Sequence, residues 1–270
     1  MNKFIIMMSL LTSSFALAAG PNFSNLTQSD FDNVIRELSA NASFHSATGA
    51  SSLGSIFGLE LALVGGTTST PEINSLSKTA DPNSNVPNLP HASLLVAVSV
   101  PFGFTGEFLL FPSTSVGDFK YQQSGAALKW TANSVLALPL NLAVRAFMTK
   151  NELSFKQTLN NASTGNVPVD VTVTQDMSQT GLQLLLSPNL PIIEPYVGLG
   201  TISAKGNLAV SGSTTGTIFN FTSAQSADSS PSSTQYLVGL DVKLLVFAFG
   251  LEYSKAFSTE TYNAKFGFRF

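Results

Sequence analysis

The feature that most constrains this chain is a period-two alternation of apolar and polar side chains, which recurs along its 270 residues. Over residues 136–145, leucines and a valine at the even positions alternate with Ala, Pro, Asn and Arg at the odd ones. Over residues 236–243, Tyr, Val and Leu alternate in the same way with Leu, Gly, Asp and Lys. Because successive side chains of a strand point to opposite faces of a sheet, each stretch predicts a strand with one apolar face.

Composition indicates what kind of sheet these strands form. Charged residues make up 11% of the chain, against about 25% in soluble domains. The face opposite the apolar one is mostly Gly, Ala, Ser, Thr and Asn, whereas the water-facing side of a soluble β-sandwich would carry many Lys and Glu. After residue 20 the sequence has no apolar stretch of about 18 residues that could form a spanning helix. The remaining way to satisfy a backbone in lipid is a closed barrel.

We therefore predict an all-β fold, a transmembrane up-and-down antiparallel β-barrel. Thirteen segments are candidate strands, but bacterial single-chain barrels normally have an even number. Either residues 43–50 form another strand or one of the thirteen segments is not a strand of its own. The prediction is about 12 strands, with 14 as the next choice. Polar stretches at 67–90, 160–166 and 222–233 predict extracellular loops, and short breaks near 101–103 and 187–189 predict periplasmic turns.

The first 19 residues have the layout of a cleaved secretory signal peptide. Lys3 supplies a positive charge, residues 4–11 form a short apolar core, and residues 16–18 give the small-x-small pattern that a signal peptidase cleaves. Export and a barrel together predict the bacterial outer membrane as the location. The predicted regions are a signal peptide at 1–19, a periplasmic or plug segment at 20–42, and the barrel at 43–270.

A short helix is predicted over residues 29–38. Ser29 can cap its amino end, and Phe31, Val34, Ile35 and Leu38 form one apolar face. The helix could plug the mouth of the barrel, or it could lie on the periplasmic side under the rim. The second placement is slightly favoured.

The last ten residues read as a closing strand that ends in Phe270. A final strand of alternating apolar residues with a C-terminal Phe resembles the insertion signal of bacterial outer-membrane β-barrel proteins. The closing segment 236–270 as a whole resembles the last hairpins of poorly characterised members of that class. The resemblance implies three kinds of partner: the barrel assembly machinery, periplasmic chaperones and outer-membrane lipids. It also implies these signal positions: Tyr262, Phe266, Phe268 and Phe270.

The sequence contains few motifs that would indicate catalysis or the binding of a cofactor. His91 and Ser93 have the His-x-Ser spacing used by lipases and lipid A deacylases of the outer membrane, because period two puts both on one face. No acid or amide near them in the sequence supports a third member, so we predict no enzyme activity. Two separated histidines give no metal-ligand cluster and no phosphate loop is present, so no metal or cofactor is predicted. The net charge of −3 gives no basic stripe for nucleic acid.

Charged residues at positions predicted to face inward bear most directly on function. In a wide barrel they would line a water-filled pore, and in a narrow one they would pair across the lumen and hold it shut. The leading hypothesis is a small channel or passive transporter for ions or small or hydrophobic solutes, in one version a fatty-acid-type transporter with an N-terminal hatch. The alternative is a structural or surface-interaction barrel with a closed lumen. The predicted lumen-lining residues are Glu60, Lys120, Lys129, Arg145, Asp241, Lys243, Glu252, Lys265 and Arg269.

Overall fold

A computed structural model describes residues 28–54, 56–80, 82, 85–116, 119–132, 140–161, 167–213 and 222–270. These residues form the helices α2 (Gln28–Asn41) and α3 (Pro71–Ala80) and the 3-10 turn η2 (Pro101–Gly103). Neither described helix is long and apolar enough to cross a bilayer. The strands are β1 (Gly58–Ser69), β2 (Asn88–Val100), β3 (Phe104–Val116), β4 (Phe119–Thr131), β5 (Leu140–Asn161), β6 (Val167–Pro188), β7 (Ile193–Ser213), β8 (Thr222–Ser229), β9 (Ser232–Leu244), β10 (Phe247–Ala256) and β11 (Thr259–Arg269).

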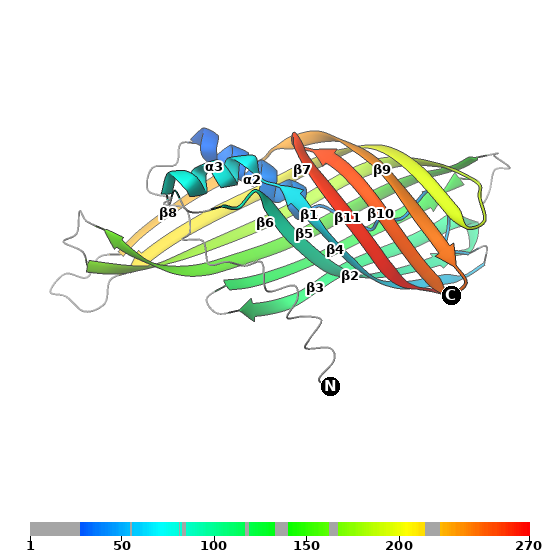
Figure 1. Cartoon of the computed structure of the whole chain (residues 1–270), viewed down its shortest axis with the longest axis horizontal. Helices are drawn as coiled ribbons and strands as arrows, with labels where there is room; N and C mark the ends of the chain where they lie inside the picture. The colour runs from blue at the N-terminus through cyan, green and yellow to red at the C-terminus, as the bar shows by residue number, and fades with distance from the viewer. Residues whose placement is uncertain are drawn as a thin grey trace.

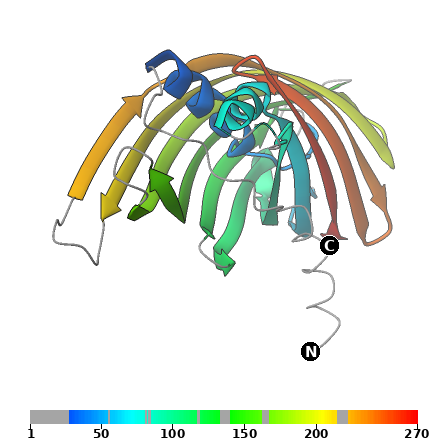
Figure 2. The same ribbon diagram turned by 60° about the vertical axis from the view of Figure 1, so that its left-hand side comes forward.

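Ten of these strands close into an antiparallel barrel (Figures 1 and 2). Each strand pairs with the next one along the chain, except that β7 pairs with β9. The barrel closes where β11 pairs with β1, from Glu60↔Arg269 to Thr68↔Thr261. The prediction of an all-β antiparallel barrel is confirmed, and the prediction of about 12 strands is wrong. Three pairs of predicted segments merge into β5, β6 and β7, which are 21 or 22 residues long. In β5 and β6 each strand continues past the point where its apolar residues change from one face to the other, and the sequence pattern alone shows a break there.

The short strand β8 extends the line of β9. Strand β7 pairs with β9 up to Ser203↔Ser232 and with β8 from Gly206↔Ser229 onward. The break between β8 and β9 falls at Pro231, which has no backbone N–H to donate to a ladder. Most of the stretch 222–233, predicted as a loop, is therefore strand.

The two ends of the barrel differ. The end that we call the C-terminal mouth carries Phe270, η2 and the β9–β10 turn. The opposite end, the α3 mouth, carries the β10–β11 turn and residues 70–87, the longest connection between consecutive strands. The predicted loop at 67–90 contains the ten-residue helix α3, and most of the predicted loop at 160–166 lies outside the described residues.

Side chains sort in the reverse of a soluble protein. On β11, Phe266 and Phe268 are exposed, whereas Lys265 before them and Arg269 after them are buried. The same holds on β10, where Leu251 is exposed and Glu252 is buried. Because period two sends alternate residues to opposite faces, the barrel has an apolar exterior and a polar, charged interior.

The chain that precedes β1 occupies this interior. Residues 39–50 are all buried and those at 51–54 are half-buried, and we call 39–54 the lumenal segment. No strand is assigned within it, so residues 43–50 do not form the additional strand considered above. An eight-stranded barrel is just filled by its own side chains, and ten strands leave room for one more stretch of chain.

Candidate functional site

The lumenal segment passes through the barrel from the α3 mouth to the C-terminal mouth. Strands β2 and β4 run in that same direction, and the contacts of the segment with them follow in order. The contacts with β2 are Asn41 Nδ2 to Leu89 O at 2.8 Å, the ring of His45 stacked on His91 at 4.8 Å, and Leu53 N to Ser99 Oγ at 3.0 Å. The contacts with β4 are Gln123 Nε2 to Ala42 O at 3.1 Å, Lys129 Nζ to Gly49 O at 3.0 Å, and Thr131 Oγ1 to Ala50 O at 2.8 Å.

Small residues make this close fit possible. The segment from 39 to 51 is mostly Ser, Ala, Thr, Asn and Gly, with Phe44 and His45 as its large side chains. A Cβ on Gly49 would lie 2.4 Å from Glu194 Oε1, and a Cβ on Gly250 of β10 would lie 2.5 Å from Ala47 O. Both distances are too short for a real Cβ contact, so glycine at these two positions lets the segment approach the wall.

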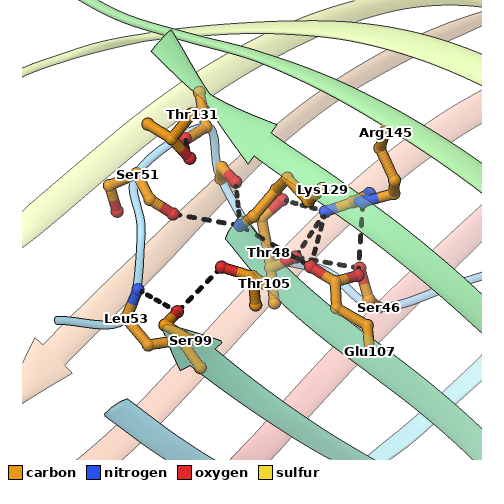
Figure 3. Close-up of polar contacts among 12 residues, drawn as sticks. Ser46, Thr48, Ser51, Leu53, Ser99, Thr105, Glu107, Lys129, Thr131 and Arg145 are labelled. Carbon is orange, nitrogen blue, oxygen red and sulfur yellow. Dashed lines mark hydrogen bonds and ion pairs between the residues drawn. The ribbon is translucent and has the colours of Figure 1, made fainter. Parts of the chain in front are cut away.

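A first buried cluster joins the segment to β3, β4 and β5 (Figure 3). Glu107 Oε2 lies 3.2 Å from Arg145 Nε, and Glu107 Oε1 lies 3.6 Å from Lys129 Nζ. All three side chains are 1% exposed. One carboxylate thus faces two cations, which leaves positive charge in surplus inside the cluster.

Carbonyl groups of the lumenal segment balance that surplus. Arg145 Nη2 donates to Thr48 O at 3.1 Å, and Lys129 Nζ donates to both Gly49 O and Ser51 O at 3.0 Å. A buried cation without such partners is costly. The cluster and the segment therefore stabilise one another.

A second buried cluster lies between β1, β9 and β11. Lys265 Nζ is 2.8 Å from Glu60 Oε1 and 3.2 Å from Asp241 Oδ1. Arg269 Nη2 lies 2.9 Å from Asp241 Oδ2 and also contacts Glu60. Two acids and two bases, none more than 8% exposed, neutralise each other.

A third cluster lies toward the C-terminal mouth. Glu194 accepts hydrogen bonds from the backbone N–H of Ser51 at 2.8 Å and from Ser187 Oγ at 2.7 Å. Lys243 Nζ lies 3.1 Å from Glu194 Oε2 and donates to Ser51 Oγ at 2.7 Å. Glu194 and Lys243 thus hold Ser51 of the lumenal segment against the wall from two strands, β7 and β9.

The two histidines belong to the contact between segment and wall. His91 Nε2 lies 2.7 Å from Asn263 Oδ1, and its Nδ1 lies 3.1 Å from Asn41 Nδ2. His45 Nε2 lies 3.1 Å from Ala40 O, and its Nδ1 lies 3.2 Å from Asn263 Nδ2. These partners give both rings a donating Nε2 and an accepting Nδ1. Both nitrogens of His91 are occupied, so the ring is not free to act as a base toward Ser93.

Helix α2 is fixed at the α3 mouth. Glu37 accepts hydrogen bonds from the backbone N–H groups of Glu72 at 2.7 Å and Ile73 at 2.9 Å, in the first turn of α3. It thereby satisfies donors that have no partner within that helix. Burial raises the pKa of the Glu37 carboxyl, and these two amide bonds counter the rise in part.

Eight of the nine predicted lumen-lining residues lie on the inner side of the barrel, and Lys120 does not. Lys120 is exposed, whereas Lys129 of the same strand is buried. The two are nine residues apart in β4, and an odd separation puts side chains on opposite faces. Grouping Lys120 with the lumen residues was therefore wrong.

Glu252, another of the predicted lumen residues, accepts a hydrogen bond from Tyr196 Oη at 2.9 Å and lies 3.3 Å from Asn263 Nδ2.

Two buried charged residues of the described lumen wall were missed, Glu107 and Glu194, and so was the buried Tyr196, which donates a hydrogen bond to Glu252. The signal for Glu107 was present, because the exposed Phe104, Phe108 and Leu110 set the face of β3 and leave position 107 inside. The same signal was present for Glu194 and Tyr196, because the exposed Ile193, Val197 and Leu199 set the face of β7 and leave positions 194 and 196 inside.

Other predicted features are placed as follows. The proposed insertion-signal residues Tyr262, Phe266, Phe268 and Phe270 are exposed on the outer surface, and their role as a signal stays a prediction. Among the described residues, no group of three or more His, Cys, Asp and Glu side chains could hold a metal ion. Residues 1–27, which include the predicted signal peptide, lie outside the described residues.

Three solved structures of known proteins resemble this chain at low identity. The translocator domain of the autotransporter NalP from Neisseria meningitidis is 11% identical, with a TM-score of 0.41 and coverage of 90% of this chain and 95% of its own. Ail of Yersinia pestis is 10% identical, with a TM-score of 0.30 and coverage of 80% and 99%. The toluene transporter TodX of P. putida is 8% identical, with a TM-score of 0.33 and coverage of 79% and 89%. At these TM-scores the likenesses support no statement about function.

No curated protein matches the sequence. The sequence model of a family of unknown function, DUF6588, matches residues 1–270. The chain belongs to the DUF6588 family.

Proposed function

We propose that this chain is an integral outer-membrane β-barrel whose lumen is closed by its own lumenal segment. It would act through the surface it presents at the α3 mouth and not through an open pore. Two observations support the proposal, the apolar exterior of the barrel and the filled interior. The apolar exterior supports the membrane location, and the filled interior supports the proposal that the lumen is closed.

Every strand of the closed barrel contributes to the apolar exterior. On β11 the exposed apolar side chains run from Tyr262 to Phe270, eight residues along the chain. That is about 26 Å of strand, or about 20 Å of bilayer at a tilt of roughly 40°, close to the band of about 25 Å found in outer-membrane barrels. One exposed apolar residue from each strand is Leu61, Leu94, Phe108, Leu128, Met148, Leu184, Val197, Val238, Leu251 and Phe268.

The apolar exterior forms a belt around the barrel, and this belt ends before the α3 mouth. Exposed charged side chains appear on the outer surface toward the α3 mouth, among them Lys150, Asp176, Lys205 and Lys255. At the C-terminal mouth, Phe102 in η2 is 72% exposed, and the turns there extend the apolar belt. Long connections are extracellular and short turns periplasmic in such barrels, so we orient the α3 mouth to the outside.

The occupied lumen supports a closed barrel. Residues 39–50 are buried from end to end, and the charged side chains of the wall pair with one another or with the segment. An open aqueous pore would leave such charges facing water. The interpretation in which interior charges hold the lumen shut is therefore the better supported one.

A second candidate is a channel that opens when the lumenal segment leaves. The observation in its favour is the chemistry of the segment, which is short-chained, polar and held largely by hydrogen bonds to charged wall residues. Water could replace those bonds more readily than it could replace apolar packing. Removal of the segment would expose a passage with mixed charges.

Conductance in planar bilayers separates the two candidates. Purified, heat-modifiable wild-type protein is expected to insert without discrete conductance steps under ordinary voltages. Steps from the wild type, at a constant unit size, would contradict the closed barrel and support the channel. The matched comparison is Gly250→Ala, which is expected to displace the segment, and Gly106→Ala, whose added Cβ meets its nearest neighbour at an ordinary 3.7 Å.

A further inference from the structure

We propose that the amino end of α2 lies on the outside of the cell, so that the chain enters its own barrel from the extracellular mouth. This inference rests on the proposed outer-membrane location. Export by a signal peptide does not explain this position of α2, because it delivers the chain only to the periplasmic side of the outer membrane.

The first support is the direction of the lumenal segment. As residue numbers rise from 41 to 53, the contacts on β2 move from Leu89 to Ser99. Strand β2 runs from the α3 mouth to the C-terminal mouth, and β4 and β6 run the same way. The segment therefore descends from the α3 mouth and reaches the opposite end where β1 begins at Gly58.

The second support is the position of α2 at the α3 mouth (Figures 1 and 2). Glu37 binds the first turn of α3. Ile35 is fully buried and so close to Gly206 that a Cβ there would lie 2.9 Å from it. Ser39 Oγ lies 3.2 Å from Met177 Sδ. Gly206 and Met177 are paired where β7 passes from β9 to β8, above the apolar belt.

The route has a consequence for assembly. Helix α2 carries Asp30, Asp32, Arg36 and Glu37 over 14 residues, so it cannot cross a bilayer through lipid on its own. The lumen is already filled by side chains and one stretch of chain. On this topology α2 reaches the outside through the interior of the barrel and not through lipid.

Single cysteines test this topology without background, since the chain has no cysteine. Ser29→Cys reports the amino end of α2, Ser258→Cys the α3 mouth and Leu245→Cys the C-terminal mouth. Ser29 and Ser258 are exposed, and Leu245 is 100% exposed. Each variant is treated with a membrane-impermeant maleimide on intact cells and on permeabilised cells, and the extent of labelling is compared.

Positions 29 and 258 are expected to label to the same extent in both samples, and position 245 at least tenfold more after permeabilisation. Labelling of 258 but not of 29 on intact cells would overturn the inference and leave the barrel in place. Labelling of 245 but not of 258 would reverse the orientation and overturn the inference as well. Protein that alkaline carbonate removes from the membrane fraction would instead contradict the proposed outer-membrane barrel.

Discussion

A single methyl group at Gly250 is expected to loosen the lumenal segment. In Gly250→Ala the new Cβ would lie 2.5 Å from Ala47 O, whereas ordinary contacts begin near 3.4 Å. The backbone at Ala47 must therefore retreat by about 0.9 Å. Strand β10 is held by β9 and β11 on both sides, so the segment is the partner that moves.

The cost follows from the bonds next to that contact. Strands β4 and β5 lie across the barrel from β10, so the shift presses the segment against Arg145 Nη2, now 3.1 Å from Thr48 O, and Lys129 Nζ, now 3.0 Å from Gly49 O. A shift of about 0.9 Å would bring both pairs below the shortest hydrogen-bonding distance of about 2.7 Å, so both bonds must rearrange. Hydrogen bonds to charged groups are worth about 1.5 to 3 kcal/mol each. Partial relaxation lowers the sum, so we expect the segment to be destabilised by about 3 to 5 kcal/mol.

Hydrogen exchange measures this change directly. A loss of 3 kcal/mol raises the open population roughly a hundredfold, and amides of residues 46–50 should exchange faster by that factor. The control Gly106→Ala adds the same methyl to a strand with a 3.7 Å neighbour and should leave these amides unchanged. Equal protection of residues 46–50 in the two variants would refute the packing argument.

Three further predictions concern charge, capping and assembly. Glu107→Gln removes the carboxylate from a buried cluster that holds two cations, so the urea unfolding midpoint should fall by an amount equivalent to about 3 to 5 kcal/mol. Its control Glu260→Gln breaks an exposed pair and should cost less than about 1 kcal/mol, and equal losses would contradict the role of burial. Glu37→Ala removes the acceptor for two amides of α3, and exchange at Ile73 should rise by an amount equivalent to about 1 kcal/mol; no change there would show that α3 is capped otherwise. Deletion of Phe270 should lower the heat-modifiable, membrane-inserted fraction in cells, and normal insertion would contradict its role as an insertion signal.

Much of the architecture was predictable from the sequence because period two determines which side chains share a face. It predicted the barrel and placed eight charged residues inside, from Glu60 to Arg269. The strand number was wrong for a physical reason. Long strands such as β5 extend past the apolar belt toward the α3 mouth, and in the sequence the polar part of each strand resembles a separate strand.

The position of the lumenal segment could not be predicted in the same way. Helix α2 has an apolar face whether it lies in the mouth or under the rim, and the small residues after Asn41 carry no period. Their place depends on the space that ten strands enclose and on the surplus positive charge around Arg145. Both arise only when distant strands come together.

One cross-link tests most directly whether the chain fills its own barrel. His45 and His91 stack with ring centroids 4.8 Å apart, one from the lumenal segment and one from β2. In a His45→Cys, His91→Cys double variant, a short thiol cross-linker should join the two peptides in the folded, membrane-inserted protein, as mass spectrometry would show. Two reactive but unlinked thiols in a correctly folded barrel would contradict a lumen closed by residues 39–54.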